Sequence, residues 1–267
     1  MPPKMRSGRG RREAHKGKKN MKKIIGCLFA GILLLGLCGC GAETVAPEPQ
    51  PAEELESAVL QEEPDPAEDP ADIGERMLRS SVNIITGAGD YGAGFAVENG
   101  YIVTNYHVLY GSPEDITVIT YERDEYPAVL LGYDEAADIA VLEIGAELES
   151  SVLGDSDQVI AGETVTAVGN PYGDLSFARA SGEILDVDEK LLDVIDRNRR
   201  FLYYDGDAVS GFSGGPVYDA QGTVIGVLNS RYAGDLSAYD FDRLCGIIPI
   251  NTVKESVGKI LSQESAQ

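Results

Sequence analysis

Cysteine is scarce in this sequence of 267 residues, which has four of them. Cys27, Cys38 and Cys40 lie in or directly after an apolar run near the N-terminus, and Cys245 lies far beyond it. If that run is removed immediately before Cys40, Cys245 is the one other cysteine that remains, and no internal disulfide is available. We therefore expect a fold that is held by packing alone.

Positive charge is also scarce, because 22 Lys and Arg residues face 44 Asp and Glu residues and give a formal net charge of −22. This balance argues against a nucleic-acid partner and against binding to anionic lipid through charge. Part of the acidity lies in residues 40–75, which are rich in proline, alanine and acid and have almost no aromatic content. Such a composition predicts a self-repelling, disordered linker.

A hydrophobic run long enough to span a membrane is missing as well. The apolar run Ile24–Leu37 is too short for a comfortable span, and it follows Lys22 and Lys23. Residues 21–39 are therefore predicted to be an export signal that begins at Met21. The alternative is an uncleaved membrane anchor.

The end of this run, LCGC at residues 37–40, resembles the lipobox of bacterial lipoproteins. The resemblance implies that Cys40 becomes the lipidated first residue of the mature chain, with the remaining residues outside the cytoplasm and tethered to a membrane. Residues 1–20 are basic and almost free of apolar side chains, so they cannot fold by burial. They lie upstream of the true start, or else they form an arm for nucleic acid.

Residues 76–263 have a different pattern, in which short β-branched runs such as GYIVTNYHV, DITVITY and TVIGVLN are separated by Gly, Asn and Asp turns. This spacing predicts an all-β sandwich or barrel. Helical spacing is found in residues 251–263, with Asn251 or Thr252 as the cap. The side chains expected on its apolar side are Val253, Val257, Ile260 and Leu261. We expect one domain, closed by this helix and followed by a tail at 264–267.

Histidine is rarer still, since the chain has two, His15 and His107. The stretch AVSGFSGGPVYDAQG places Ser213 between glycines, and a serine nucleophile needs a base, almost always a histidine that a carboxylate orients. Because His15 lies in the excluded leader, His107 is the imidazole available to Ser213. GFSGG also matches the GxSxG elbow of α/β-hydrolases, but in that fold a histidine follows the serine, and none follows Ser213.

The remaining order of histidine, acid and serine is that of the chymotrypsin-type arrangement. The acid is then expected between His107 and Ser213. Asp138, which opens the apolar run DIAVLEI, is the best candidate. Asp134 and Glu135 lie in the preceding turn and are expected to be solvated.

Several spaced motifs follow one another along residues 76–262, namely GAGFAVENGYIVTNYHVL, DEAADIAVLEI, LGDSDQVIAGETVTAVGNPYG, ASGEIL, SGFSGGPVYDAQGTVIGVLNS and GIIPINTVKE. In this order they resemble the protease domain of trypsin-like serine proteases of the bacterial HtrA (Deg) type. The resemblance implies an all-β, two-barrel antiparallel chymotrypsin-like fold with the active site between the barrels. It also implies His107 as the general base, Asp138 as the acid that orients it and Ser213 as the nucleophile. The N–H groups of Gly211 and Ser213 would form the oxyanion hole.

Two features depart from that family. HtrA-type proteases typically carry one or more PDZ domains after the protease domain, whereas this chain ends at Gln267, so we expect no activation through such a domain. At Phe212 the family more often has asparagine, and trypsins have an aspartate that pairs with a newly cut N-terminus. A phenylalanine cannot form that ion pair, which argues against a zymogen step of this kind. Phe212 either keeps the oxyanion loop ordered or lets it collapse.

Asp207 lies six residues before Ser213, where trypsins carry the aspartate at the bottom of the primary specificity pocket. A carboxylate in a partly desolvated pocket predicts cleavage after Arg or Lys. The alternative is that Asp207, like Asp205, is one more solvated acid. Asn229 and Ser230 are further candidate substrate-binding residues.

Other sequence features carry weaker signals. The tyrosine-rich segments FLYYDGD and NSRYAGDLSAYDFD either surround the substrate cleft or contribute ordinary packing. The acidic turns DSD and DLSAYDFD are interpreted as solvated loops rather than calcium sites, because no known ligand spacing is present. Cys245 is expected to be a small buried hydrophobe.

Two functions follow from these observations. The first is a membrane-tethered, extracytoplasmic serine endopeptidase that acts on proteins or peptides. The second is a catalytically silent relative that binds peptides or senses misfolded protein in the same cleft. The complete set of His107, Asp138 and Ser213 favours the enzyme. No cofactor, metal ion or nucleic-acid partner is predicted, and the sequence gives no evident sign of an oligomer.

Overall fold

The computed structural model describes residues 69–186, 201–237 and 241–264, and all of them belong to the unit Pro47–Gln267. The predicted leader at 1–20, the export signal at 21–39, Cys40 and the linker up to residue 68 lie outside the described residues. Within the described part of the chain, no helix is long and apolar enough to cross a membrane.

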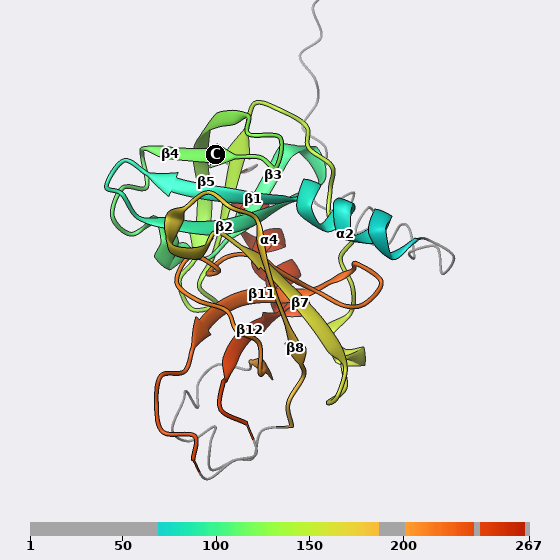
Figure 1. The fold of residues 1–267 in the computed structure, drawn as a ribbon. Helices are drawn as coiled ribbons and strands as arrows, with labels where there is room; N and C mark the ends of the chain where they lie inside the picture. The colour runs from blue at the N-terminus through green and yellow to red at the C-terminus, as the bar shows by residue number, and fades with distance from the viewer. Residues whose placement is uncertain (1–68, 187–200, 238–240, 265–267) are drawn as a thin grey trace, which may run out of the picture. The chain divides into compact units, whose positions relative to one another are not determined.

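The first half of this unit is a closed antiparallel barrel with the strand order β1-β2-β3-β6-β5-β4, in which β4 returns to pair with β1 (Figure 1). Its strands are β1 (Ser81–Thr86), β2 (Tyr91–Val97), β3 (Tyr101–Thr104), β4 (Ile116–Ile119), β5 (Glu125–Asp134) and β6 (Ile139–Ile144). The β-branched runs that predicted strands provide the inward-facing side chains, among them Val82, Ile84, Ile102, Val118 and Leu142.

The second half is a six-stranded antiparallel sheet with the order β8-β7-β10-β11-β12-β9. Its strands are β7 (Thr164–Gly169), β8 (Ala178–Glu183), β9 (Leu202–Tyr204), β10 (Pro216–Tyr218), β11 (Val224–Arg231) and β12 (Cys245–Pro249). The two edge strands meet through an isolated bridge between Ile184 and Tyr204 and a bond from the Leu185 N–H to the Tyr203 carbonyl at 2.8 Å. This bridge closes the sheet into the second barrel, so the predicted two-barrel fold is confirmed.

An apolar cluster lies between the barrels and contains side chains from both. Phe95 and Ile139 come from the first barrel, and Val168, Tyr218 and Val227 come from the second. Burial of this apolar surface is the main force that holds the two barrels together. We call the contact between the barrels, formed by this cluster, the seam.

The terminal helix α4 (Ile250–Glu264) packs on strand β5, and its buried side chains are Ile250, Val253, Ser256, Ile260 and Leu261. Gly132 allows this approach, because a Cβ atom there would lie 2.9 Å from Cγ2 of Ile260. The predicted cap at Asn251 or Thr252 is wrong, since the helix already begins at Ile250. The Asn251 N–H instead donates to the Ser156 hydroxyl at 3.2 Å. A serine that is distant in the sequence therefore accepts from an N–H group of the first turn, as a local capping residue would.

A helix that the sequence analysis did not predict, α2 (Pro70–Arg79), begins inside the expected linker at 40–75. Asp69 caps it by accepting from the Ala71 N–H at 2.8 Å, and Pro70 occupies its first position. Its side chain Met77 is buried in the cluster between the barrels. The folded domain therefore starts about six residues before the expected Arg76, because the acid and proline that suggested a linker are also good residues for a helix start.

Candidate active site

His107 and Asp138 form a close pair at the edge of the first barrel. His107 lies in the short 3-10 turn η2 (Tyr106–Leu109), which follows β3, and Asp138 immediately precedes β6. The imidazole Nδ1 lies 2.6 Å from Oδ2 of Asp138, and the His107 backbone N–H donates to Oδ1 at 2.9 Å. One carboxylate therefore orients both the ring and the backbone of His107.

The backbone of Asp138 is itself held in an uncommon conformation. Its φ of 59° lies in the left-handed region, which costs a non-glycine residue free energy but which aspartate tolerates better than most. The Asp138 carbonyl accepts from the Asn105 side-chain amide at 2.9 Å and from the Tyr106 N–H at 3.2 Å. These bonds fix the turn that points the carboxylate at His107.

Asn229, on strand β11, reaches across the seam to the same carboxylate. Its side-chain amide donates to Oδ2 of Asp138 at 2.6 Å. Asp138 is 5% exposed, and burial alone would raise its pKa. Hydrogen bonds from His107 and Asn229 and the nearby imidazole outweigh that cost and hold the pKa of Asp138 below its ordinary value. Asp138 is therefore an anion at neutral pH.

Ser213 lies in the loop before β10, and this loop is docked on the first barrel. The Ser213 carbonyl accepts from the Ala93 N–H of β2 at 2.9 Å. Gly214 follows with a φ of 83°, and a Cβ atom there would lie 2.2 Å from the Thr104 hydroxyl and 2.3 Å from the Ala93 carbonyl. Only a glycine at this position lets the serine loop come so close to the first barrel.

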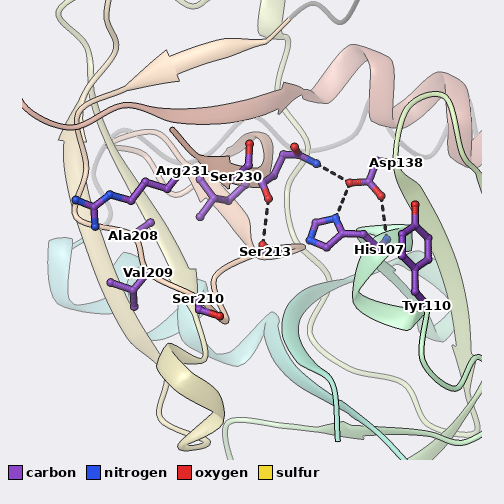
Figure 2. Close-up of a pocket in the computed structure, with 11 residues that line it drawn as sticks. His107, Tyr110, Asp138, Ala208, Val209, Ser210, Ser213, Ser230 and Arg231 are labelled. Atoms are coloured by element: carbon purple, nitrogen blue, oxygen red, sulfur yellow. Dashed lines mark hydrogen bonds and ion pairs between the residues drawn. The ribbon is translucent and has the colours of Figure 1, made fainter. Parts of the chain in front are cut away.

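Figure 2 shows the imidazole of His107 between Asp138 and Ser213, with the ring edge opposite Asp138 turned toward the serine. In the described structure the Ser213 hydroxyl donates to the Asn229 carbonyl at 3.1 Å, and no hydrogen bond joins it to His107. Hydrogen bonds of this kind are often long or absent before a substrate binds. The three side chains nevertheless line one cavity.

The peptide between Ser210 and Gly211 has a defined orientation. Its carbonyl accepts from the Tyr172 N–H at 2.8 Å, and because a trans peptide is planar, the Gly211 N–H points the opposite way. Gly211 has a φ of 99°, and a Cβ atom there would lie 1.8 Å from the Asn170 carbonyl oxygen. Within the described residues, the N–H groups of Gly211 and Ser213 donate to no acceptor, so both are available to a ligand.

Phe212, between these two residues, is 3% exposed and belongs to the apolar core of the second barrel. It packs on Gly169 so closely that a Cβ atom there would lie 2.5 Å from the phenylalanine ring. The alternative in which Phe212 lets the loop collapse therefore disagrees with the structure. Phe212 therefore anchors the loop through apolar packing.

The sequence analysis did not predict the role of the loop from Asn170 to Phe177, which forms hydrogen bonds to the Ser210 and Gly211 carbonyls. The Asn170 N–H donates to the Gly211 carbonyl at 3.0 Å, and the Asn170 side chain accepts from the Leu175 N–H at 2.7 Å. Tyr172 and Leu175 both have a positive φ, of 55° and 63°. The dipeptide Asn-Pro in VGNPYG signals such a turn, but nothing in the sequence shows what the turn supports.

The cavity that these residues share has a volume of about 530 Å³. His107, Tyr110 and Asp138 line it from the first barrel, while residues 208–210, Ser213 and residues 228–231 line it from the second. The candidate substrate-binding residues Asn229 and Ser230 are thus part of the lining. Among the described residues, no three His, Cys, Asp or Glu side chains are grouped so as to hold a metal ion.

Asp207 does not line this cavity, and the expectation of a partly desolvated carboxylate there is wrong. Its side chain is 68% exposed and lies 3.9 Å from Nη1 of Arg231 and 3.7 Å from Nη1 of Arg243. The alternative of a solvated acid, left open by the sequence, therefore holds. The prediction failed because two cations supplied by more distant parts of the chain surround the carboxylate.

The tyrosines of FLYYDGD are packing residues, because Tyr203 and Tyr204 are both buried. A different tyrosine, Tyr110, lies exposed beside His107 and lines the cavity. Its ring meets Tyr106 edge-on, with ring centroids 4.9 Å apart, and Tyr106 stacks on Tyr133 at 3.8 Å. The aromatic wall of the site thus comes from the first barrel. The expectation that Cys245 is a buried small hydrophobe agrees with its zero exposure.

Comparisons with known proteins agree with this geometry. Residues 92–227 match the family described as the trypsin-like peptidase domain. The chain is 33% identical over 199 residues to a serine protease Do-like HtrA of Bacillus subtilis (strain 168), covering 72% of this chain and 43% of that protein. It is 37% identical over 178 residues to a probable periplasmic serine endoprotease, DegP-like, of Rickettsia prowazekii (strain Madrid E), covering 63% of this chain and 33% of that one.

Among solved structures, the chain is similar to an HtrA-type protease, AlgW with tripeptide, at a TM-score of 0.63 and 26% identity. The match covers 73% of this chain and 64% of that one. The chain spans less than half the length of these two curated relatives. The prediction of a trypsin-like peptidase is thus confirmed at the level of family, and the similarity to HtrA-type proteases agrees with the finer prediction. This chain belongs to the family of trypsin-like peptidases.

Proposed function

We propose that the chain is an active serine endopeptidase in which His107 is the general base, Asp138 orients it and Ser213 is the nucleophile. The observation that carries the proposal is the His107–Asp138 pair at 2.6 Å, which shares one cavity with Ser213. Among the described residues, the N–H groups of Ser213 and Gly211 have no acceptor. A rotation about the Cα–Cβ bond of Ser213 moves its hydroxyl from the Asn229 carbonyl toward the imidazole. Membership in the trypsin-like peptidases supports the same assignment.

The chemistry proceeds through an acyl-enzyme. His107 takes the hydroxyl proton while the Ser213 oxygen attacks the carbonyl carbon of the substrate. The imidazolium then gives that proton to the leaving amine as the C–N bond breaks, and an ester remains on Ser213. Water, deprotonated by the same imidazole, hydrolyses the ester. Asp138 stays ionised throughout and stabilises the imidazolium, which agrees with its lowered pKa.

The N–H groups of Gly211 and Ser213 serve as the oxyanion hole in this proposal. Negative charge develops on the substrate oxygen in the tetrahedral intermediate, and donors that are already oriented stabilise it without reorganisation. The bond from Tyr172 to the Ser210 carbonyl supplies that orientation before a substrate arrives. The oxyanion hole is therefore proposed to be formed before a substrate binds.

We also propose that the enzyme works outside the cytoplasm, tethered through a lipid on Cys40. The support is the export signal at 21–39 with its lipobox-like end, followed by an acidic linker that lifts the domain from the membrane. The Rickettsia relative is named as periplasmic, which fits the same location. Replacement of Cys40 by alanine should abolish lipid attachment. An unmodified Cys40, or a mature chain that starts elsewhere, detected by mass spectrometry would contradict this part of the proposal.

Covalent labelling of the full chain by a fluorophosphonate probe tests the enzymatic proposal, because the probe reacts only with an activated serine. We expect labelling that disappears in Ser213→Ala. Ser237→Ala is the control, since it removes an exposed serine hydroxyl that does not line the cavity and should leave labelling intact. An intact chain that is not labelled, yet binds peptides, would instead identify the silent relative.

A further inference from the structure

One end of the cavity carries a positive charge that the proposed mechanism does not use. Arg231, the last residue of β11, lines the cavity, and Arg243 lies close to it through their shared neighbour Asp207. Both guanidinium groups lie farther from the Asp207 carboxylate than the about 3.2 Å limit of a normal N–H to oxygen hydrogen bond. One solvated carboxylate thus faces two cations without a hydrogen bond to either.

The geometry of the lining places Arg231 where a substrate side chain would end. Figure 2 shows Ala208, Val209 and Ser210 on one side of the cavity and Ser230 and Arg231 on the other, with the guanidinium turned away from Ser213. If the side chain of the residue before the cut occupies the part of the cavity between these two segments, its far end meets the guanidinium of Arg231 rather than a carboxylate.

Two guanidinium groups and two carboxylates lie near this end, and of the four residues Arg231 alone is part of the cavity lining. The carboxylates of Asp207 and Asp242 are 68% and 92% exposed, so water screens them from a side chain inside the cavity. Asp205 is turned elsewhere, since its carboxylate accepts from the Glu183 N–H at 2.8 Å. Among the described residues, Arg231 forms no hydrogen bond, so its donors are free to hold a carboxylate in the bidentate geometry that guanidinium groups prefer.

We infer that Arg231 is a specificity-determining residue and that the enzyme cleaves after acidic side chains. The inference rests on the proposed function, since it names the substrate class of that same site. It replaces the expected preference for Arg or Lys, because a basic substrate side chain would become a third cation beside Arg231 and Arg243. The lining hydroxyls of Ser210 and Ser230 add donors that suit a carboxylate.

The test compares matched peptides that differ only in the residue before the cut: Glu, Gln, Asp, Asn, Lys and Ala. Glu and Gln have nearly the same shape, so their ratio isolates the charge. For the full chain we expect kcat/KM for Glu to exceed that for Gln by about 10- to 100-fold, the size of one to two charge-assisted hydrogen bonds. Equal rates for Glu and Gln, or a preference for Lys, would overturn the inference.

Variants assign the effect to Arg231. Arg231→Gln should bring the Glu to Gln ratio close to one, and Arg231→Glu should reverse the preference to Lys. Arg243→Gln is the matched control, because it removes the guanidinium that does not line the cavity and should keep the preference for Glu. Asp207→Asn should raise the Glu to Gln ratio, whereas a trypsin-like pocket would lose its cleavage after Lys.

Failure of this inference can be distinguished from failure of the proposed function. Active-site titration with the fluorophosphonate probe reports the function alone, and a labelled enzyme without acidic preference would refute only the role of Arg231. If the chain is not labelled, binding to Ser213→Ala still decides the matter. Peptides that end in Glu should then bind about tenfold or more tightly than peptides that end in Gln, and equal binding would overturn the inference.

Discussion

The two barrels hold their halves of the active site by different means. In the first barrel, a side chain holds the site in place, since the buried carboxylate of Asp138 accepts from the ring and the backbone of His107. In the second barrel, backbone hydrogen bonds hold the site in place. The Ser210 and Gly211 carbonyls accept from the N–H groups of Tyr172 and Asn170, and glycines allow the close approach.

This difference predicts two kinds of failure. A substitution in the first half removes a chemical group from the His107–Asp138 pair. A substitution at a glycine of the second half moves the peptide that carries the proposed oxyanion donors, although the side chains of His107, Asp138 and Ser213 remain. Asn229 belongs to both halves, because its side chain bonds to Asp138 and its carbonyl accepts from Ser213. The following predictions test the comparison from the largest expected effect to the smallest.

Loss of a chemical group should have the largest effect. Ser213→Ala and His107→Ala should each lower kcat by about 10⁶-fold, the size of loss found when serine proteases lose either group. Asp138→Asn should cost about 10⁴-fold, because the amide holds the imidazole in the wrong tautomer. Peptide hydrolysis by the purified variants measures this. Near wild-type turnover by Ser213→Ala, with contamination excluded, would end the serine-protease account.

Displacement of the Ser210–Gly211 peptide, which carries a proposed oxyanion donor, should have the next largest effect on kcat. In Gly211→Ala, the new Cβ atom meets the Asn170 carbonyl oxygen at 1.8 Å, so the loop has to move. We expect kcat to fall by about 10²- to 10³-fold, the cost of one lost oxyanion donor. Gly162→Ala is a matched control, since Gly162 also has a positive φ, of 89°, but a Cβ atom there meets nothing within 4 Å. Equal losses in both variants would mean that backbone strain, and not the oxyanion loop, explains the effect.

The residue that joins the two halves should have an intermediate effect. Asn229→Ala removes a 2.6 Å bond to Asp138, and a displacement of the pair by about 1 Å lowers the rate by up to about 100-fold. We therefore expect kcat to fall by about 10- to 100-fold. Ser230→Ala, which changes the next residue of the lining, is the matched variant and should lower kcat less. Peptide hydrolysis by the two variants measures this, and equal losses would contradict the positioning role of Asn229.

The buried carboxylate also predicts how stability depends on pH. Because the pKa of Asp138 in the folded chain lies below its ordinary value of 3.8, the unfolded chain takes up its proton first as pH falls. The stabilisation from Asp138 is thus complete above about pH 5 and is lost as pH falls through the folded pKa. Urea unfolding at about pH 5 and pH 3 should show that wild type loses more free energy of unfolding than Asp138→Asn. Parallel losses in the two proteins would contradict the assignment.

The sequence predicted which side chains the structure brings together better than it predicted their supports. His107 could be singled out because the other histidine, His15, lies in the predicted leader, and the order along the chain then pointed to Asp138. The bond from Asn229 to Asp138 joins residues 91 positions apart, so no local pattern predicts it. The support of the Ser210–Gly211 peptide by Tyr172 is equally a tertiary contact.

The strands were predicted because β-branched runs and turn residues carry a local signal, whereas helix α2 and the surroundings of Asp207 were not predicted. Helix α2 was missed because Asp69 and Pro70 occur in an acidic, proline-rich stretch whose composition suits a linker. The surroundings of Asp207 were missed because Arg243 approaches it from 36 positions away. The charge near a pocket depends on which side chains the tertiary fold brings beside it. The number of residues between Asp207 and Ser213 does not predict those neighbours.

Acylation of the full chain by an activated ester tests the central claim most directly, namely that the two halves meet to activate Ser213. The account predicts a burst of released alcohol that corresponds to one acyl group per chain, with the acyl group mapped by mass spectrometry to the peptide that contains Ser213. The burst should be absent in Ser213→Ala and strongly slowed in Asp138→Asn. Acylation that is no faster than in the urea-unfolded chain, or that occurs on other residues, would contradict it.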